Sequence, residues 1–439
     1  MRDIALTLIV VVGLFFALRR TWVGVLLWTW LSIMNPQRLT YGFAFSAPFA
    51  YATALITLIS IPFNKKDLRL PLDPFVVLLP LLMIWMCVTT VFALDQAGSI
   101  PLLIRSLKID LMVLVAVAAI RSRKQIELFI WVNALSIAFY GVKGGIFTIA
   151  TGGGMHVWGP DDSFIQGNNE LGLACVLTIP LLNYLRVVER RAWMRTALMA
   201  VMVLTALAAL GSQSRGALLA IGAMALMLIL RSRRKVMGTL VVAVTGVLLV
   251  AFMPASWEAR MHTIDTYQQD ASAMGRINAW WMCFHLANDR FLGGGFSSYD
   301  AATFAKYAPN PHDIHAAHSI YFQMLGEHGY VGLALFLILG AYSFLTAGKI
   351  RRQTKKQPEG QWAFELSSMI QVSMVGFAVG GAFLSLAYFD LPYNVLVALV
   401  ACKYWLAEKR WETEPEGAFG SGAPLGRLPK PVPAAGARR

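Results

Sequence analysis

The sequence contains few charged residues. Only 14% of its 439 residues are Asp, Glu, Lys or Arg, whereas 57% are hydrophobic. An ordinary soluble domain has about 25% charged residues, so this composition argues against the water-soluble globular class. Apolar runs long enough to cross a hydrocarbon core of ~30 Å recur along the chain. They favour one membrane bundle over several globular domains.

Cysteine is also scarce. Cys87, Cys175, Cys283 and Cys402 are far apart in the sequence and form no C-x-x-C pair. This spacing argues against a structural metal site and against a redox motif. Only Cys283 falls in a segment that we expect on the outer, oxidising side of the membrane, so it has no evident disulfide partner.

Acidic residues are outnumbered by basic ones, and the net charge is +14. The positive charges form short clusters between apolar runs and no continuous basic face. No recognition helix, aromatic platform or zinc module accompanies them, so we expect no nucleic-acid partner. Membrane lipid is the expected environment instead, because clusters of this kind are typical of the positive-inside rule.

The apolar runs predict an all-α fold, namely a polytopic integral membrane bundle of about 12 transmembrane helices. They cover residues 4–18, 20–34, 43–62, 72–94, 101–120, 125–150, 168–186, 196–211, 216–230, 236–253, 317–347, 364–388 and 392–406. The first two runs are short, so whether both of them span the membrane stays open. We predict one transmembrane domain over residues 1–410. Residues 411–439 are rich in Glu, Gly, Pro and Ala, and we expect them to form a disordered cytoplasmic tail.

One orientation satisfies all the basic clusters, because even numbers of spans separate them. The clusters are Lys65–Arg69, Arg121–Lys124, Arg186–Arg195, Arg231–Lys235 and Lys349–Lys356. All five are predicted to be cytoplasmic. The longest connection on the opposite side covers about residues 254–316 and is predicted to carry short helices. The best of these is an amphipathic helix from Arg276 to Arg290, with Ile277, Trp280, Trp281 and Phe284 as its apolar positions.

Two arginines on the outer side are candidates for anion binding. Arg215 lies in a polar turn between two apolar runs, where the positive-inside rule disfavours a positive charge. Arg276 opens the amphipathic helix of the long loop, and a cation at that end opposes the helix dipole. A bound phosphate would reverse this balance, because the free N–H groups and the guanidinium would both face an anion.

A histidine-rich segment ends the long loop. His318 is predicted to lie in the first turns of the following membrane helix, where a neutral imidazole is able to accept a proton. His312, His315 and His318 are spaced three apart, which would give them a shared helix face and the option of a metal site. Positions six apart diverge around a helix, and no carboxylate beyond Asp313 completes a ligand set. We therefore predict no metal and no cofactor.

Other candidates for substrate contact are less distinctive. Arg105 and Lys108 lie near the outer end of one apolar run, where they would either reach the same anion or pair with Asp390 or Asp110. The remaining candidates are polar residues that face the outer side: His156 and Gln166 in a loop with Trp158, and Tyr321 just after His318. The loop residues also fit ordinary loop polarity.

Taken together, these motifs resemble the O-antigen ligase and polymerase superfamily. The similarity is greatest to its ligase branch, including a subgroup described as O-glycosylation ligases. The residues that carry it are Ser214-Arg215-Gly216 between two helices, Arg276 with Trp280 and Gly293–Gly295 in the long loop, and His318-Ser-Ile-Tyr321 with Glu327, Gly329 and Gly332. Ser319 stands where Asn is the more usual residue, which puts a role for that side chain in doubt.

The resemblance implies a reaction and a location. A glycan on undecaprenyl pyrophosphate would be passed to a sugar hydroxyl of lipid A core at the periplasmic face of a bacterial inner membrane, without metal or nucleotide sugar. Arg215 and Arg276 would bind the pyrophosphate, and His318 would act as base in an inverting displacement. A polymerase or a protein O-oligosaccharyltransferase is the alternative. A transporter is less favoured, because the notable charges stay near the outer helix ends. The oligomeric state is left open.

Overall fold

The computed structural model describes residues 1–231 and 271–414. Within these ranges every regular element is a helix, so the all-α prediction is confirmed for the part described. The predicted span 236–253, the first part of the long loop and nearly all of the predicted tail lie outside the described residues.

The helices follow the predicted apolar runs closely. They are α1 Arg2–Arg19, α2 Thr21–Met34, α3 Phe49–Ser60, α4 Pro74–Val91, α5 Gln96–Ala119, α6 Arg123–Ala150, α7 Asn168–Val188, α8 Ala192–Gly211, α9 Arg215–Arg231, α12 Ala271–Asp289, α13 Ala301–Tyr307, α14 Ile320–Thr354, α15 Gln361–Gly380 and α16 Asp390–Ala407. A short 3-10 turn, η5 Gly381–Phe383, extends α15. In the described ranges, six helices are long and apolar enough to cross a membrane: α4, α6, α7, α8, α14 and α15 with η5.

The chain is therefore a multi-pass membrane protein, although its total of about 12 spans stays a prediction. Helix α7 lies in the centre of the bundle, because 78% of its most apolar window is buried, against 33% for the same window of α8. A helix that is apolar on every face is stable only when neighbours or lipid surround it. Helices α6, α8, α9 and α15 pack around α7.

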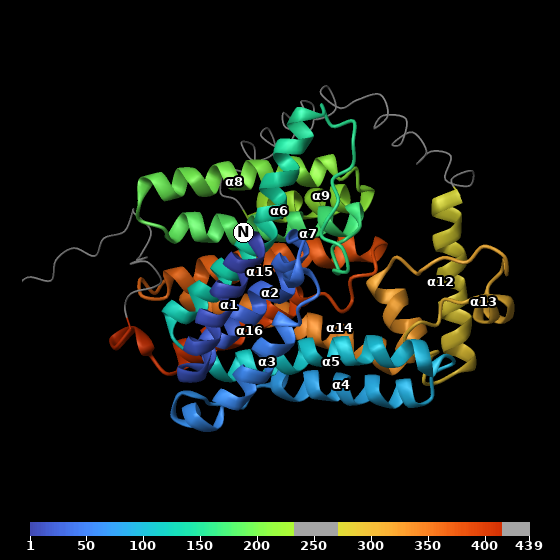
Figure 1. Ribbon diagram of the computed structural model, residues 1–439, viewed down its shortest axis with the longest axis horizontal. Helices are drawn as coiled ribbons and strands as arrows, with labels where there is room; N and C mark the ends of the chain where they lie inside the picture. The colour runs from blue at the N-terminus through green and yellow to red at the C-terminus, as the bar shows by residue number, and fades with distance from the viewer. Residues whose placement is uncertain (232–270, 415–439) are drawn as a thin grey trace, which may run out of the picture.

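Basic loops gather at one end of the bundle. Arg69, Arg121 and Arg410 surround the carboxylate of Glu408, with N–O distances of 3.5, 3.7 and 2.8 Å. The opposite end carries α12 and α13, and Figure 1 shows α12 running across the ends of α4 and α5. Two of the predicted cytoplasmic clusters therefore share one end, as the positive-inside rule requires.

Glycines join the long loop to α14. Gly329 has φ of 64° and interrupts the helix, and Gly293 has φ of 69°. The loop backbone lies against this interruption, because the N–H of Gly294 donates to the carbonyl of Gly326 at 2.8 Å. A Cβ on Gly293 would stand 2.7 Å from the amide nitrogen of Gly329 and 2.8 Å from the carbonyl oxygen of Gly326. Only glycine fits there.

Replacing Gly293 by Ala is expected to lower the thermal unfolding midpoint in detergent. The left-handed backbone alone costs about 1–3 kcal/mol for a residue with a Cβ, and the backbone contact adds to that cost. Gly222→Ala is the matched control, because a Cβ at Gly222 in α9 meets no atom within 4 Å of the described chain. The control should match or slightly exceed the parent, since Ala favours a helix. Equal midpoints for both variants would contradict this account of the loop.

Candidate functional site

Helix α12 forms the outer wall of the site. The amphipathic helix predicted from the sequence is confirmed, but it begins at Ala271, so Arg276 lies in its second turn and not at its N-terminus. Its predicted apolar face is partly wrong, because Trp281 and Phe284 are 49% and 38% exposed. The buried face consists of Ala279, Met282, Cys283 and Leu286, which pack on Phe304, Tyr307 and Ala317. The helix lies across the end of the bundle, and this buried face is the one that contacts the rest of the protein.

Trp280 fastens α12 to the start of α14. Its indole N–H donates to the carbonyl of Ala317 at 2.7 Å. Its ring stacks on that of Phe322, with centroids 5.1 Å apart, and lies 6.4 Å from that of Phe383 in η5. The backbone next to His318 is therefore fixed from two sides, by α12 and by the end of α15.

His318 lies outside the helix that the sequence assigned to it. Helix α14 begins at Ile320, and His318 has φ of 43°. The prediction that His318 occupies the first turns of α14 is therefore wrong. The segment 308–319 leading to α14 is not helical, and a left-handed residue turns its side chain out of the helical path. The Nδ1 atom is buried and has no hydrogen-bond partner among the described residues.

The same finding removes the basis of the three-histidine alternative. His312, His315 and His318 do not share a helix face, because none of them is in a helix. Among the residues that the structure describes, no group of three His, Cys, Asp or Glu side chains is arranged to hold a metal ion. His315 instead faces Asp313, with 2.8 Å between Nε2 and Oδ1.

Positive charge surrounds His318. Its pKa is lowered from 6.5 to about 4, mainly by burial and in smaller part by the charges of Arg276 and His315. Gly275 makes room for this cluster, because a Cβ there would stand 2.3 Å from the ring of His315. The structure thus brings together Arg276 and His318, two of the three residues predicted as catalytic, and keeps the imidazole neutral at neutral pH.

Glu170 belongs to the same cluster, and the sequence analysis missed it. It lies in the first turn of α7, within electrostatic range of Arg276. A capping position of this kind, three residues after Gly167 and before an apolar run, was a detectable signal. Its carboxylate balances part of the charge of Arg276 while no anion is bound.

Arg215 is the first residue of α9 and follows a buried turn. The turn is tied to α7 by the Asn168 amide, which donates to the carbonyl of Ser212 at 2.7 Å. Gln213 donates to the carbonyl of Gly153 at 3.0 Å. On the other side, a Cβ on Gly216 would contact Phe383, the residue that also packs near Trp280. Arg215 therefore lies at the same end of the bundle as Arg276 and His318.

The loop between α6 and α7 contains two of the other predicted site residues, Gln166 and His156. Gln166 accepts a hydrogen bond from the N–H of Asp162 at 3.3 Å and donates to Asp161 at 3.4 Å, so its amide braces the loop. The rings of His156 and Trp158 lie 6.5 Å apart, and Trp158 is 64% exposed. The indole of Trp158 therefore lies at the surface of this loop, next to the imidazole of His156.

Arg105 and Lys108 face a different part of the surface from His318. The guanidinium of Arg105 donates to the carbonyl of Asp162 at 3.2 Å and lies 3.9 Å from the centre of the Phe164 ring. It is also within electrostatic range of Asp390, as the sequence alternative proposed. Both cations line a groove between α2, α3 and α5.

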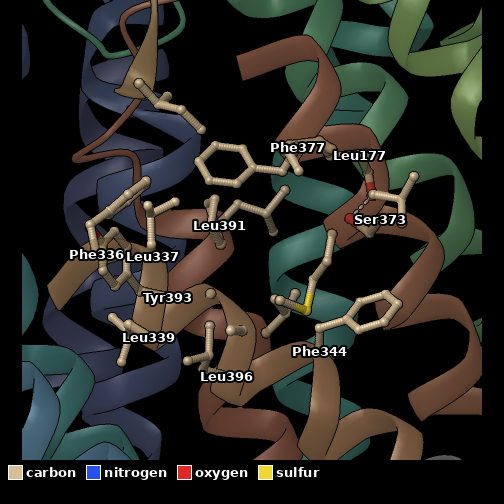
Figure 2. A pocket seen from close by; sticks show the side chains of 18 of the residues that line it. Leu177, Phe336, Leu337, Leu339, Phe344, Ser373, Phe377, Leu391, Tyr393 and Leu396 are labelled. Atoms are coloured by element: carbon tan, nitrogen blue, oxygen red, sulfur yellow. Dashed lines mark hydrogen bonds between the residues drawn. The ribbon is translucent and has the colours of Figure 1, made fainter. Parts of the chain in front are cut away.

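An apolar cavity of about 320 Å³ opens beside the site, between α7, α14, α15 and α16. Figure 2 shows its walls, with Phe336, Phe344, Phe377 and Leu391 around the empty space. Ile320 and Tyr321 lie at its edge, directly after His318 and Ser319. The Tyr321 hydroxyl donates to the carbonyl of Ala378 at 2.7 Å, which ties this edge to α15. The volume lies in the range of small-ligand pockets, about 300–1,000 Å³.

A polytopic membrane fold with a cluster of ionisable side chains near an apolar cavity is typical of a membrane protein with a functional site at that place. Residues 200–337 match the family described as O-Antigen ligase, and residues 1–190 match a family of unknown function (DUF5935). The match supports the resemblance to the O-antigen ligase and polymerase superfamily for residues 200–337, and it indicates a glycosyl-transfer class of enzyme. Among curated proteins, none matches the chain.

Titration of His318 tests the electrostatics of the site. Carbon-13 NMR of histidine-labelled protein, with His318→Gln to assign the signal, should give a midpoint near pH 4. Inorganic pyrophosphate should raise that midpoint, because a nearby anion favours the imidazolium. The unfolded state binds more protons between about pH 4 and 6.5, so His318 should make stability rise with pH across this window. A midpoint near 6.5 without pyrophosphate would contradict the burial of the imidazole.

Proposed function

We propose that the chain transfers a glycan from undecaprenyl pyrophosphate to a sugar hydroxyl of lipid A core. The observation that carries this proposal is the cluster of Arg276 and the neutral, partly buried His318, within a region that matches the O-antigen ligase family. The proposed location is a bacterial inner membrane. The α12 end would face the periplasm, and the basic end with the C-terminus would face the cytoplasm.

The donor pyrophosphate is assigned to Arg215 and Arg276. A guanidinium holds a phosphate with two parallel hydrogen bonds and stays charged at every working pH. Arg215 also begins α9, whose first N–H groups add positive potential at that helix end. During transfer the bond between the anomeric carbon and the phosphate oxygen breaks, and the pyrophosphate leaves with the electron pair. The arginines stabilise that developing charge.

His318 is assigned the proton of the acceptor hydroxyl. The hydroxyl oxygen attacks the anomeric carbon as His318 takes its proton, which inverts the anomeric centre. A base with a pKa of about 4 is weak while the site is empty. The incoming dianion raises that pKa, so the imidazole becomes a competent base only when the donor is bound. The protonated ring then returns the proton to solvent.

The donor's isoprenoid chain is assigned to the apolar cavity of Figure 2. The cavity starts two residues after His318, so a lipid whose pyrophosphate meets Arg276 has its chain at the edge formed by Ile320 and Tyr321. Ser373 is a polar residue in the wall, and its hydroxyl is occupied by the carbonyl of Leu177 at 2.8 Å. The surface offered to the chain is therefore almost wholly apolar.

The transfer assay uses purified protein in detergent with chelator, lipid-linked glycan as donor, and lipid A core as acceptor. His318→Ala should lower kcat by ~10²–10⁴-fold, the usual contribution of a general base. Arg276→Ala should lower kcat by ~10²–10³-fold, and Arg276→Lys should recover only part of it, because the forked hydrogen bonds are lost. His312→Ala is the matched control, since His312 is exposed in the same segment.

The acceptor arms of the same assay decide between related functions. Transfer to a second lipid-linked glycan in place of lipid A core would establish the polymerase, and transfer to a Ser or Thr peptide would establish the protein glycosyltransferase. Undiminished transfer by His318→Ala would overturn the assignment of the base.

Gly340→Leu tests the isoprenoid assignment. Gly340 lines the cavity, and a Cβ there meets no described atom within 4 Å, so the added side chain enters empty space. The variant should raise KM for the full-length polyprenyl donor by ~10-fold, about the transfer free energy of two CH₂ groups. A short-chain donor should be unaffected. Gly222→Leu, which also has open space, should change neither value. Equal effects on long and short donors would remove the chain from this cavity.

A further inference from the structure

The groove that Arg105 and Lys108 line lies on the surface formed by α2, α3 and α5, apart from the apolar cavity beside α14. It encloses about 500 Å³ and has apolar walls. The apolar residues that line it include Trp28, Leu55, Leu58, Ile104 and Met112. Several wall side chains are open to the surroundings, such as Leu55 at 46% and Ile104 at 45% exposure. In a membrane protein such a surface meets lipid chains.

Two cations interrupt this apolar surface. Arg105 and Lys108 are three residues apart on α5 and therefore share a helix face. The guanidinium of Arg105 donates a hydrogen bond to the carbonyl of Asp162 and lies over the ring of Phe164. The nearby carboxyl of Asp390 balances part of its positive charge. The ammonium of Lys108 lies 5.6 Å from the centre of the Tyr51 ring, and within the described ranges it forms no ion pair.

Both cations lie near the polar loop between α6 and α7. Arg105 donates to the carbonyl of Asp162 in that loop, and Lys108 follows one helical turn later on α5. Ser99 in that turn donates to the carbonyl of Phe296, and Leu94 just before α5 donates to Gly294, both in the segment beyond α12. The first turn of α5 is therefore joined to the loop that follows α12, and Arg105 and Lys108 lie further along the same helix. A cation that faces lipid at the boundary is stabilised by a phosphate.

The loop between α6 and α7 links this groove to the proposed transfer site. Asp162 in the loop pairs with Arg38 at 2.8 Å and accepts from Arg105, while the loop leads directly into Asn168, which binds the turn before Arg215. Glu170 follows two residues later, within electrostatic range of Arg276. A lipid held in the groove thus has one polar loop between its headgroup and the cluster around His318.

We propose that this groove binds the acceptor lipid, an acylated glycolipid that carries a phosphate. Lys108 and Arg105 hold its phosphate, and its acyl chains lie along α2 and α3. The charge of the groove is complementary to a phosphate, and its walls are complementary to acyl chains. The inference rests on the proposed function, in which the donor's pyrophosphate and isoprenoid chain occupy Arg215, Arg276 and the cavity beside α14. The phosphate of the acceptor lipid is therefore assigned to a different cation, Lys108.

Direct binding tests the groove without requiring transfer. Binding of phosphorylated lipid A to purified protein in a zwitterionic detergent is compared with binding of the phosphatase-treated lipid. Lys108→Gln should weaken binding of the phosphorylated lipid by ~10-fold, the loss expected for one hydrogen bond to a charged group. It should leave the dephosphorylated lipid unaffected. Lys143→Gln, which removes the same charge from an exposed position on α6, is the matched control and should change neither.

Two outcomes would overturn the inference. One is equal weakening by Lys108→Gln and Lys143→Gln. The other is competition by phosphatidylglycerol at the same concentration as lipid A, which would make the groove a site for bulk phospholipid. In the transfer assay, Lys108→Gln should raise KM for the acceptor and leave KM for the donor unchanged. If the parent protein transfers nothing but the Lys108-dependent binding persists, the proposed function fails and the lipid site stands.

Discussion

The contact of Trp280 with the segment before α14 is the interaction on which the site depends. Its indole N–H holds the carbonyl of Ala317, and its ring packs on Phe322. Arg276 lies one helical turn earlier on the same face of α12, and His318 follows Ala317 directly. A single side chain therefore sets the spacing between the cation and the imidazole. It also joins α12 to α14, a helix long and apolar enough to cross a membrane, so the helix bundle fixes the position of this polar cluster.

Charge sets the basicity of His318 in the proposed mechanism. Burial and the positive charge of Arg276 keep His318 neutral and weakly basic, while Glu170 balances part of the charge of Arg276. In the proposed mechanism, an anionic donor adds negative charge beside Arg276 and raises the pKa of His318, so the base is strengthened when the donor is bound. In the proposed mechanism the two lipids bind to two different apolar surfaces. One has a cavity beside α14 and the other a groove beside α5.

The sequence predicted the bundle better than the site. Helical runs such as α6 and α7 were located closely, because long apolar segments have few alternative structures. The helical placement of His318 was wrong because residue spacing does not reveal a left-handed residue. The apolar face of α12 was misjudged because its partners, Phe304 and Tyr307, come from a distant loop. Glu170 was missed, because only the fold shows that Arg276 is its neighbour.

The central claim is that Arg215, Arg276 and His318 act on one pyrophosphate. A double-mutant cycle on donor binding tests it most directly, with Arg215→Lys, Arg276→Lys and the double variant measured by titration with undecaprenyl pyrophosphate. Residues that hold one anion are coupled, so the cycle should give an interaction energy above about 0.5 kcal/mol. Additive losses would show that the two arginines bind independently and would contradict a shared pyrophosphate site.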